Sequence, residues 1–202
     1  MIKVHHSRRA RSVRVIWLLE ELAVPYEIVE HEFSIAALKA DDYRKLHPLG
    51  QVPVLEDDGL VLFESGAIVQ YLLETRGEGR LAPAPKTKER AEYLQWFDFG
   101  EATLTRYMSD VVFHRFGIPE TDRVPEMLPL ARQRLRNVLE VVEPLLERRP
   151  FVLGDAFSAA DIMMSYGITM SRIIGELPKD LPHLHAYLGR LKERPGYQRA
   201  WA

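Results

Sequence analysis

The sequence predicts an α/β domain followed by an all-helical domain. Residues 1–76 alternate short apolar runs with stretches of helical period, and an Asp-Gly turn between two apolar runs indicates a β-hairpin. A segment rich in Gly and Pro over 77–85 then interrupts every periodic pattern, and the pattern beyond it is helical throughout. We therefore expect an α/β domain over 1–76, a linker over 77–87 and a helical domain over 88–202.

The first domain is expected to have the order βαβαββα. A helix begins at Ser12, because the apolar residues that follow recur with the spacing i, i+3, i+4, i+7 on one face, and Pro25 ends it. Strands are expected over 2–6 and 26–29, an irregular helix over 35–46, hairpin strands over 53–56 and 60–63, and a final helix from Ser65 with its apolar face over 68–73.

The second domain is expected to consist of helices alone. They cover 87–116, a stretch after Pro125 that Pro144 disturbs, 158–174, 180–194 and 196–201. The 87–116 helix carries more aromatic residues, on more faces, than a single core-facing stripe requires. Part of that surplus is therefore available for a ligand or for a second copy of the chain.

Composition excludes several classes of chemistry. The chain has 27 basic and 29 acidic residues, so it lacks the basic surplus of a nucleic-acid or membrane-surface binder. It has no cysteine, which rules out thiolate metal sites and cysteine nucleophiles, and thiol chemistry would need a sulfur supplied by a ligand. The paired histidines at 5–6 and at 183 and 185 do not have metal-ligand spacing, so no metal is expected. The N-terminus shows no leader pattern, and a cytoplasmic protein is expected.

Four motifs carry a resemblance to a known family. They are RVIWLLEEL at 14–22, HPLGQVPVL at 47–55, LFESGAI at 62–68 and GDAFSAADI at 154–162. In this order and spacing they resemble the cytosolic glutathione S-transferases, of the bacterial type, over essentially the whole chain. The resemblance implies a thioredoxin-like domain that binds glutathione and a helical domain with a cleft for an apolar electrophile. It also implies a homodimer and a role in detoxification. Within the last motif, Ser158 and Asp161 are expected to form a capping box with a structural role.

The same resemblance implies a glutathione-binding site. Pro53 is held in cis in family members, which turns the backbone of Val52 toward the cysteinyl unit, and Gln51 lies near the glycyl end. Ser65, a plausible helix N-cap, would receive the γ-glutamyl carboxylate, with Glu64 facing the ammonium group. From the residues alone, Pro53 could equally be a trans proline at the start of an edge strand, and Glu64 and Ser65 a solvated acid and a helix cap.

The catalytic position departs from the family pattern. Family members stabilise the glutathione thiolate with a Tyr, Ser or Cys near the first strand–helix junction, whereas bacterial relatives often read Ser-Arg-Ser where this chain has Ala10, Arg11 and Ser12. Ser12 could donate a hydrogen bond to the sulfur or only cap its helix. Arg11, or its neighbour Arg9, could act by charge or remain in solvent. Ser7 is a third choice.

Three functions remain open from the sequence. The leading one is a transferase that conjugates glutathione to apolar electrophiles. The same thiolate attacking a peroxide or a mixed disulfide would give a glutathione peroxidase or disulfide-bond reductase. The missing hydroxyl at Ala10 allows a third function, in which the chain binds glutathione with little turnover.

Overall fold

The computed structural model describes residues 1–32, 34 and 38–202 of the chain, which forms two compact units. The first unit comprises Met1–Leu81 together with Lys192–Ala202, and the second comprises Ala82–Leu191. The sequence assigned the whole of 88–202 to the helical domain, whereas the final helix groups with the first unit in the structure.

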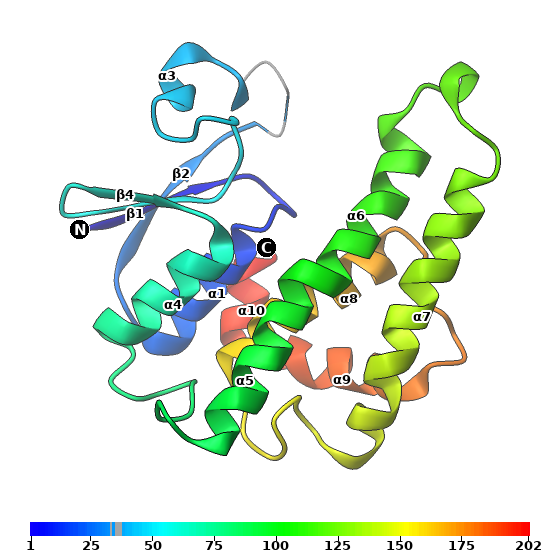
Figure 1. Cartoon of the computed structure of the whole chain (residues 1–202). Coiled ribbons are helices and arrows are strands. Elements are labelled where there is room, and N and C mark those ends of the chain that lie inside the picture. The colour runs from blue at the N-terminus through cyan, green and yellow to red at the C-terminus, as the bar shows by residue number, and fades with distance from the viewer. Residues whose placement is uncertain (33, 35–37) are drawn as a thin grey trace. The chain divides into compact units, whose positions relative to one another are not determined.

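The first unit contains a four-stranded mixed sheet with the strand order β2-β1-β3-β4 (Figure 1). Its strands are β1 (Ile2–His6), β2 (Tyr26–Glu30), β3 (Val54–Asp57) and β4 (Leu60–Phe63). Strand β1 is parallel to β2 and antiparallel to β3, and β3 is antiparallel to β4. Asp58 and Gly59 make the turn of the β3–β4 hairpin, both with positive φ, as the Asp-Gly pair predicts.

Helices cover both faces of this sheet. They are α1 (Val13–Leu22), α3 (Asp41–Arg44) and α4 (Ser65–Arg76). Helices α1 and α4 lie on one side, with α3 on the other (Figure 1). The expected βαβαββα order is confirmed. Of the irregular helix expected over 35–46, residues 35–37 lie outside the described residues, and the rest is helical at Leu38 and in the short helix α3.

Burial explains why α1 and α4 pack on the sheet. Eight of the ten residues of α1 are buried, so this helix is nearly surrounded by other elements. In α4 the apolar residues Ile68, Leu72 and Leu73 are buried within the single chain. The apolar face of 68–73 is therefore used by the core of the unit and is not available to a second copy.

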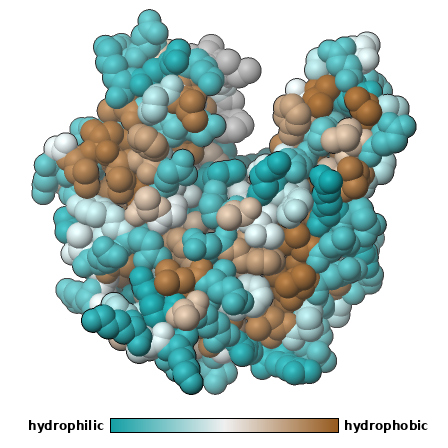
Figure 2. Space-filling view, in the orientation of Figure 1, coloured by the Kyte–Doolittle hydropathy of each residue, from teal (hydrophilic) through white to brown (hydrophobic). Residues whose placement is uncertain are grey.

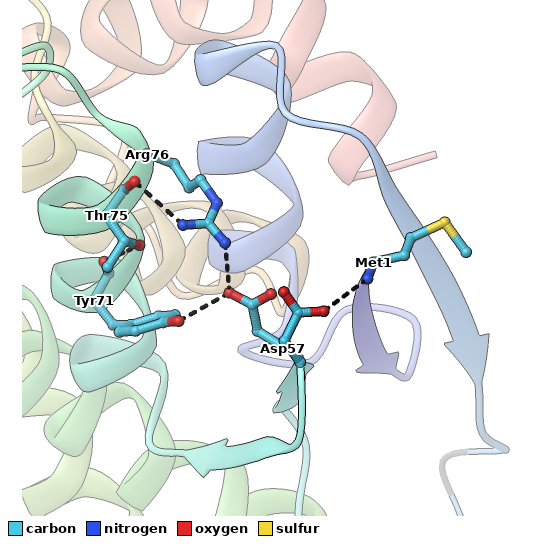
Figure 3. A network of polar contacts seen from close by, with 6 residues as sticks. Met1, Asp57, Tyr71, Thr75 and Arg76 are labelled. Atoms are coloured by element: carbon cyan, nitrogen blue, oxygen red, sulfur yellow. Dashed lines mark hydrogen bonds and ion pairs between the residues drawn. The ribbon is translucent and has the colours of Figure 1, made fainter.

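A buried carboxylate fastens α4 to the hairpin. The Oδ2 atom of Asp57, at the end of β3, accepts hydrogen bonds from the Tyr71 hydroxyl and from Arg76 Nη2, each at 2.9 Å (Figure 3). The N-terminal ammonium group of Met1 lies 3.3 Å from Asp58 in the same region. Because Asp57 is buried and doubly bonded, it fixes the direction in which the chain leaves β3.

The C-terminal helix α10 (Pro195–Ala200) packs against α1. Arg194 makes a bidentate ion pair with Glu21, with Nε and Nη2 at 2.9 and 2.6 Å from the two carboxylate oxygens. The Trp17 ring meets Tyr197 edge-on, with 5.1 Å between ring centroids. A β-carbon at Gly196 would lie 2.9 Å from the Trp17 ring, so this close approach requires glycine.

The second unit is all-helical, as expected. One helical run extends from 88 to 117 through α5 (Lys88–Asp98), a π-helical segment (Phe99–Thr105), α6 (Arg106–Val112) and a second π-helical segment (Phe113–Gly117). Its remaining helices are a short 3₁₀ turn (Glu120–Asp122), α7 (Met127–Arg148), α8 (Ala159–Ile173) and α9 (Pro182–Lys192). Helix α7 continues through Pro144, which was expected to disturb it.

The predicted capping box at Ser158 and Asp161 forms at the start of α8. The buried Asp161 carboxylate also accepts hydrogen bonds from the backbone N–H of Val152 at 2.9 Å and from the Tyr187 hydroxyl at 2.9 Å. It therefore joins three segments of the unit. In the described part of the chain, no helix is long and apolar enough to cross a membrane.

We expect Asp161→Ala to cost more than the loss of a helix cap alone. The substitution leaves several buried donors without an acceptor, and should lower the free energy of unfolding by at least about 3 kcal/mol. Ser158→Ala, which removes one side chain of the box, should cost about 1 kcal/mol. Urea denaturation measures both, with the exposed Asp155→Ala of the preceding loop as the matched control. Equal costs for Asp161→Ala and Asp155→Ala would show that the Asp161 carboxylate does not join these segments.

Candidate functional site

The sheet register brings three distant motifs to one edge of the first unit. His5 pairs with Val54, and Val54 pairs with Phe63, so these residues form a row across β1, β3 and β4. Strand β1 ends one residue beyond this row, β4 ends at it, and the antiparallel strand β3 begins at it. The junction after β1, the Val52–Pro53 segment before β3 and the Glu64–Ser65 segment after β4 therefore share one edge of the sheet.

The Val52–Pro53 peptide is cis, as the resemblance implied. The Tyr43 hydroxyl of α3 donates a hydrogen bond of 2.7 Å to the backbone carbonyl of Gln51 and so supports this segment from behind. Burial raises the pKa of Tyr43 well above its usual value, which keeps the hydroxyl protonated as a donor. Gln51 itself is exposed and Val52 is half-buried, so the segment faces solvent at the sheet edge.

The preceding loop is shaped by His47 and Gly50. The ring of His47 is buried, its Nδ1 accepts a hydrogen bond of 3.2 Å from the backbone N–H of Leu49, and it lies 4.8 Å from the Phe63 ring. Burial lowers the pKa of His47. Gly50 has a φ of 59°, and a β-carbon there would lie 2.0 Å from the carbonyl oxygen of Leu38. This loop therefore requires glycine immediately before Gln51.

The start of α4 differs from the sequence expectation. The N-cap position belongs to Glu64, which has a φ of 73°, and Ser65 is the first helical residue, so the prediction of Ser65 as N-cap is wrong. Helix α4 therefore begins one residue earlier than it would with Ser65 as the N-cap. Ser65 is buried, and its hydroxyl accepts a hydrogen bond of 3.2 Å from Arg14 Nη1, while Glu64 is exposed.

Arg14 is a residue of the candidate site that the sequence did not single out. It lies within the first motif, yet its side chain is fully buried in α1 and reaches the first turn of α4. A guanidinium there adds positive charge beneath a helix N-terminus, where backbone N–H groups already favour an anion. A charged residue inside an otherwise apolar helical face was the available signal.

Ser12 lies at the N-cap position of α1, but its side chain makes no capping hydrogen bond. The hydroxyl is fully buried, 2.8 Å from His6 Nδ1 and 3.4 Å from the carbonyl oxygen of Ser7. The Ser12 hydroxyl has one proton, which it donates to the Ser7 carbonyl when His6 Nδ1 carries a proton and donates to Ser12 Oγ; in the other tautomer of His6, Nδ1 is an acceptor for that proton. Burial lowers the pKa of His6, an effect that Arg8 reinforces and Glu30 opposes.

The rest of the junction folds as tight turns. The backbone N–H of Ala10 donates to the Ser7 carbonyl at 3.1 Å, and that of Val13 donates to the Ala10 carbonyl at 3.2 Å. Arg11 is half-buried, whereas Arg9 is exposed and has a φ of 61°. Ser7 is buried and donates its hydroxyl to the carbonyl of His31 at 2.9 Å. Of the arginines considered for the sulfur, Arg11 is thus the less exposed.

The edge therefore offers backbone donors, a helix N-terminus above a buried arginine, and an exposed acid. This set suits a zwitterionic, extended peptide ligand better than a metal ion. Among the described residues, no group of three or more His, Asp or Glu side chains is arranged to hold a metal.

Comparison with protein-family models gives two matches that together cover most of the chain. Residues 1–74 match the glutathione S-transferase N-terminal domain, and residues 102–195 match the glutathione S-transferase C-terminal domain.

Individual relatives agree with these matches over nearly their full length. A probable glutathione S-transferase of rice, GSTF2, is 31% identical over 98% of this chain and 94% of its own. Glutathione S-transferase 3 of Schizosaccharomyces pombe is 28% identical over 96% of this chain and 84% of its own. Among solved structures, the theta class enzyme of Xanthomonas axonopodis pv. citri with glutathione bound is 32% identical, with a TM-score of 0.82 over 98% of this chain and 96% of that one.

Proposed function

The chain belongs to the glutathione S-transferase family, and we propose that it binds glutathione at the sheet edge formed by Gln51, Val52, Pro53, Glu64 and Ser65. It is a glutathione transferase, an enzyme that transfers an organic group to the sulfur of glutathione. The observation that carries the proposed site is the register that brings the Val52–Pro53 segment, the start of α4 and the β1–α1 junction together.

Each part of glutathione has a matching group at this edge. The backbone of Val52 would pair with the cysteinyl unit as an added strand does, and Gln51 would lie near the glycyl end. The γ-glutamyl carboxylate would sit at the N-terminus of α4 on Ser65, where the positive charge of Arg14 lies beneath it. The exposed carboxylate of Glu64 would face the γ-glutamyl ammonium group.

We expect Ser65→Ala and Glu64→Ala each to weaken glutathione binding by about ten- to a hundredfold, since each removes a charge-assisted contact of about 1.5–3 kcal/mol. Isothermal titration calorimetry measures the affinities. Glu74→Ala, an exposed acid farther along the same helix, is the matched control and should bind as the wild type does. Unchanged affinity in both site variants would refute the assignment of the γ-glutamyl site.

We further propose that the thiolate is stabilised at the junction by the N-terminus of α1, Ser12 and Arg11. The helix N-terminus and a half-buried guanidinium both favour an anion there. Ser12 contributes only if its proton turns from its acceptor within the protein toward the sulfur, because its hydroxyl has a single proton, and a His6 Nδ1–H can continue to donate to the Ser12 oxygen. The thiolate then attacks the carbon of an apolar electrophile, and the leaving group departs with the bonding electrons.

Ser12→Ala and Arg11→Ala should each raise the pKa of the bound thiol by about one to two units, since one unit corresponds to 1.36 kcal/mol and a hydrogen bond to a charged group contributes about 1.5–3 kcal/mol. Thiolate absorbance against pH measures this shift. Arg8→Ala removes an equal charge from an exposed position of the same loop and should shift the titration less, because salt screens exposed charges. Titrations unmoved by both Ser12→Ala and Arg11→Ala would exclude these two residues.

The substrate class is tested on one purified sample. We expect conjugation of a chloronitrobenzene to exceed the reduction of a hydroperoxide or of hydroxyethyl disulfide, because the chain has no cysteine to form a mixed disulfide with the glutathione sulfur. Faster reduction of the peroxide or the disulfide would overturn this choice. Binding of glutathione without turnover of any of the three would indicate a binding protein.

We also propose that the protein is a homodimer. Apolar side chains of Leu60, Val61 and Phe63 are exposed on the edge strand β4, and Figure 2 shows apolar surface over that hairpin. The helical unit exposes Phe113 and Phe116, two members of the aromatic surplus noted in the sequence. Light scattering should therefore give about twice the 23.3 kDa of the chain.

We also propose that the enzyme is cytoplasmic and has a role in detoxification.

A further inference from the structure

Three titratable side chains are linked by hydrogen bonds on the face of the sheet that packs against α3. His5 Nε2 lies 2.9 Å from Glu56 Oε1, and His5 Nδ1 lies 2.8 Å from His31 Nε2. The two imidazole rings are close to parallel, with 18° between their planes and 5.1 Å between their centroids. His5 is buried, whereas His31 and Glu56 are half-buried, so the hydrogen bonds connect two partly exposed side chains through the buried His5 ring.

The chemistry of the donors and acceptors fixes where the protons lie. The Glu56 carboxylate only accepts, so His5 Nε2 carries a proton. In a neutral imidazole the other nitrogen is then an acceptor, so His31 Nε2 must donate to His5 Nδ1. In the neutral His31 ring, Nδ1 is therefore the nitrogen with a lone pair, and no hydrogen bond to it is found within the described residues. The series of hydrogen bonds therefore ends at His31 Nδ1, an atom that can accept a proton.

His31 is linked to two segments of the proposed glutathione site. The backbone N–H of His31 donates to the His6 carbonyl at 2.7 Å, and its carbonyl accepts the Ser7 hydroxyl at 2.9 Å, which ties it to the junction. The His31 ring also packs 4.5 Å from the ring of Tyr43, the residue that holds the Gln51 carbonyl. His31 thus lies beside the two segments that would flank the cysteinyl sulfur.

We propose that His31 accepts the thiol proton of bound glutathione and that His5 and Glu56 hold the resulting charge. This inference rests on the proposed glutathione site. The S–H bond breaks with its electron pair left on sulfur, and the proton forms a bond to His31 Nδ1. The proton on His31 Nε2 moves to His5 Nδ1, which leaves the positive charge on His5 beside the Glu56 carboxylate. His31 is in this sense a catalytic residue, and His5 and Glu56 are positioning residues.

The free protein is prepared for this transfer. Burial, followed by the proximity of His5, lowers the pKa of His31, so its ring is neutral at neutral pH and ready to accept. The positive charge appears on His5 only when the thiol gives up its proton, and the Glu56 carboxylate compensates it there. Among the described residues, Tyr43 is the other ionisable side chain with ring contacts to both histidines, and its raised pKa keeps it uncharged.

The proposal predicts that the wild type ionises glutathione without releasing the thiol proton to solvent. Calorimetry near neutral pH, in two buffers of different ionisation enthalpy, counts the protons released on binding, and thiolate absorbance counts the thiolate formed. The wild type should release close to none per thiolate, whereas His31→Gln should release about one, since the protein no longer takes it up. Glu56→Gln keeps an acceptor for His5 but removes the charge, so it should also release protons.

His183→Gln, in the helical unit, is the control for loss of a histidine and should match the wild type. If His31→Gln fails to fold, as judged by circular dichroism, the Glu56→Gln count decides. A wild type that releases about one proton per thiolate would overturn the proton chain and leave the glutathione site standing. A wild type that binds no glutathione would overturn both.

Discussion

The register of the four-stranded sheet is the constraint on which the site depends. His5, Val54 and Phe63 face one another across β1, β3 and β4, and each precedes or follows a segment proposed to contact glutathione. A shift of one residue in any pairing would turn every side chain of that strand to the opposite face. The core prevents this shift, because Val4 and Leu55, paired on the other face, are fully buried.

Local signals were enough to predict most of the fold. The apolar stripe of α1, the Asp58–Gly59 turn and the capping box of α8 each depend on a few neighbouring residues, and each is present. The π-helical segments within 88–117 were not predictable in this way. A β-carbon at Gly100 would lie 2.8 Å from the backbone of Met163, so the irregularity accompanies a close contact with α8 that no local pattern contains.

The site divides in the same manner. The motifs predicted the backbone segments of the proposed site, and the Pro53 peptide is cis as the resemblance implied. They did not reveal that Arg14 is buried under Ser65, or that Ser12 is enclosed with its hydroxyl beside His6. These contacts join residues of different elements, and a single sequence holds no information about which elements approach one another. Arginine and serine are mostly found at the protein surface, whereas the packing of this chain buries both Arg14 and Ser12.

The adjacent histidines at the end of β1 illustrate this difference. Successive side chains of a strand point to opposite faces, so His5 and His6 cannot act as a pair. His6 turns toward α1 and meets Ser12, while His5 turns toward α3 and joins Glu56 and His31. Two separate polar networks therefore converge on the same junction from the two faces of the sheet. In the proposed mechanism, the Ser12 hydroxyl on one face and the His31 acceptor on the other act on one sulfur without competing for the same proton.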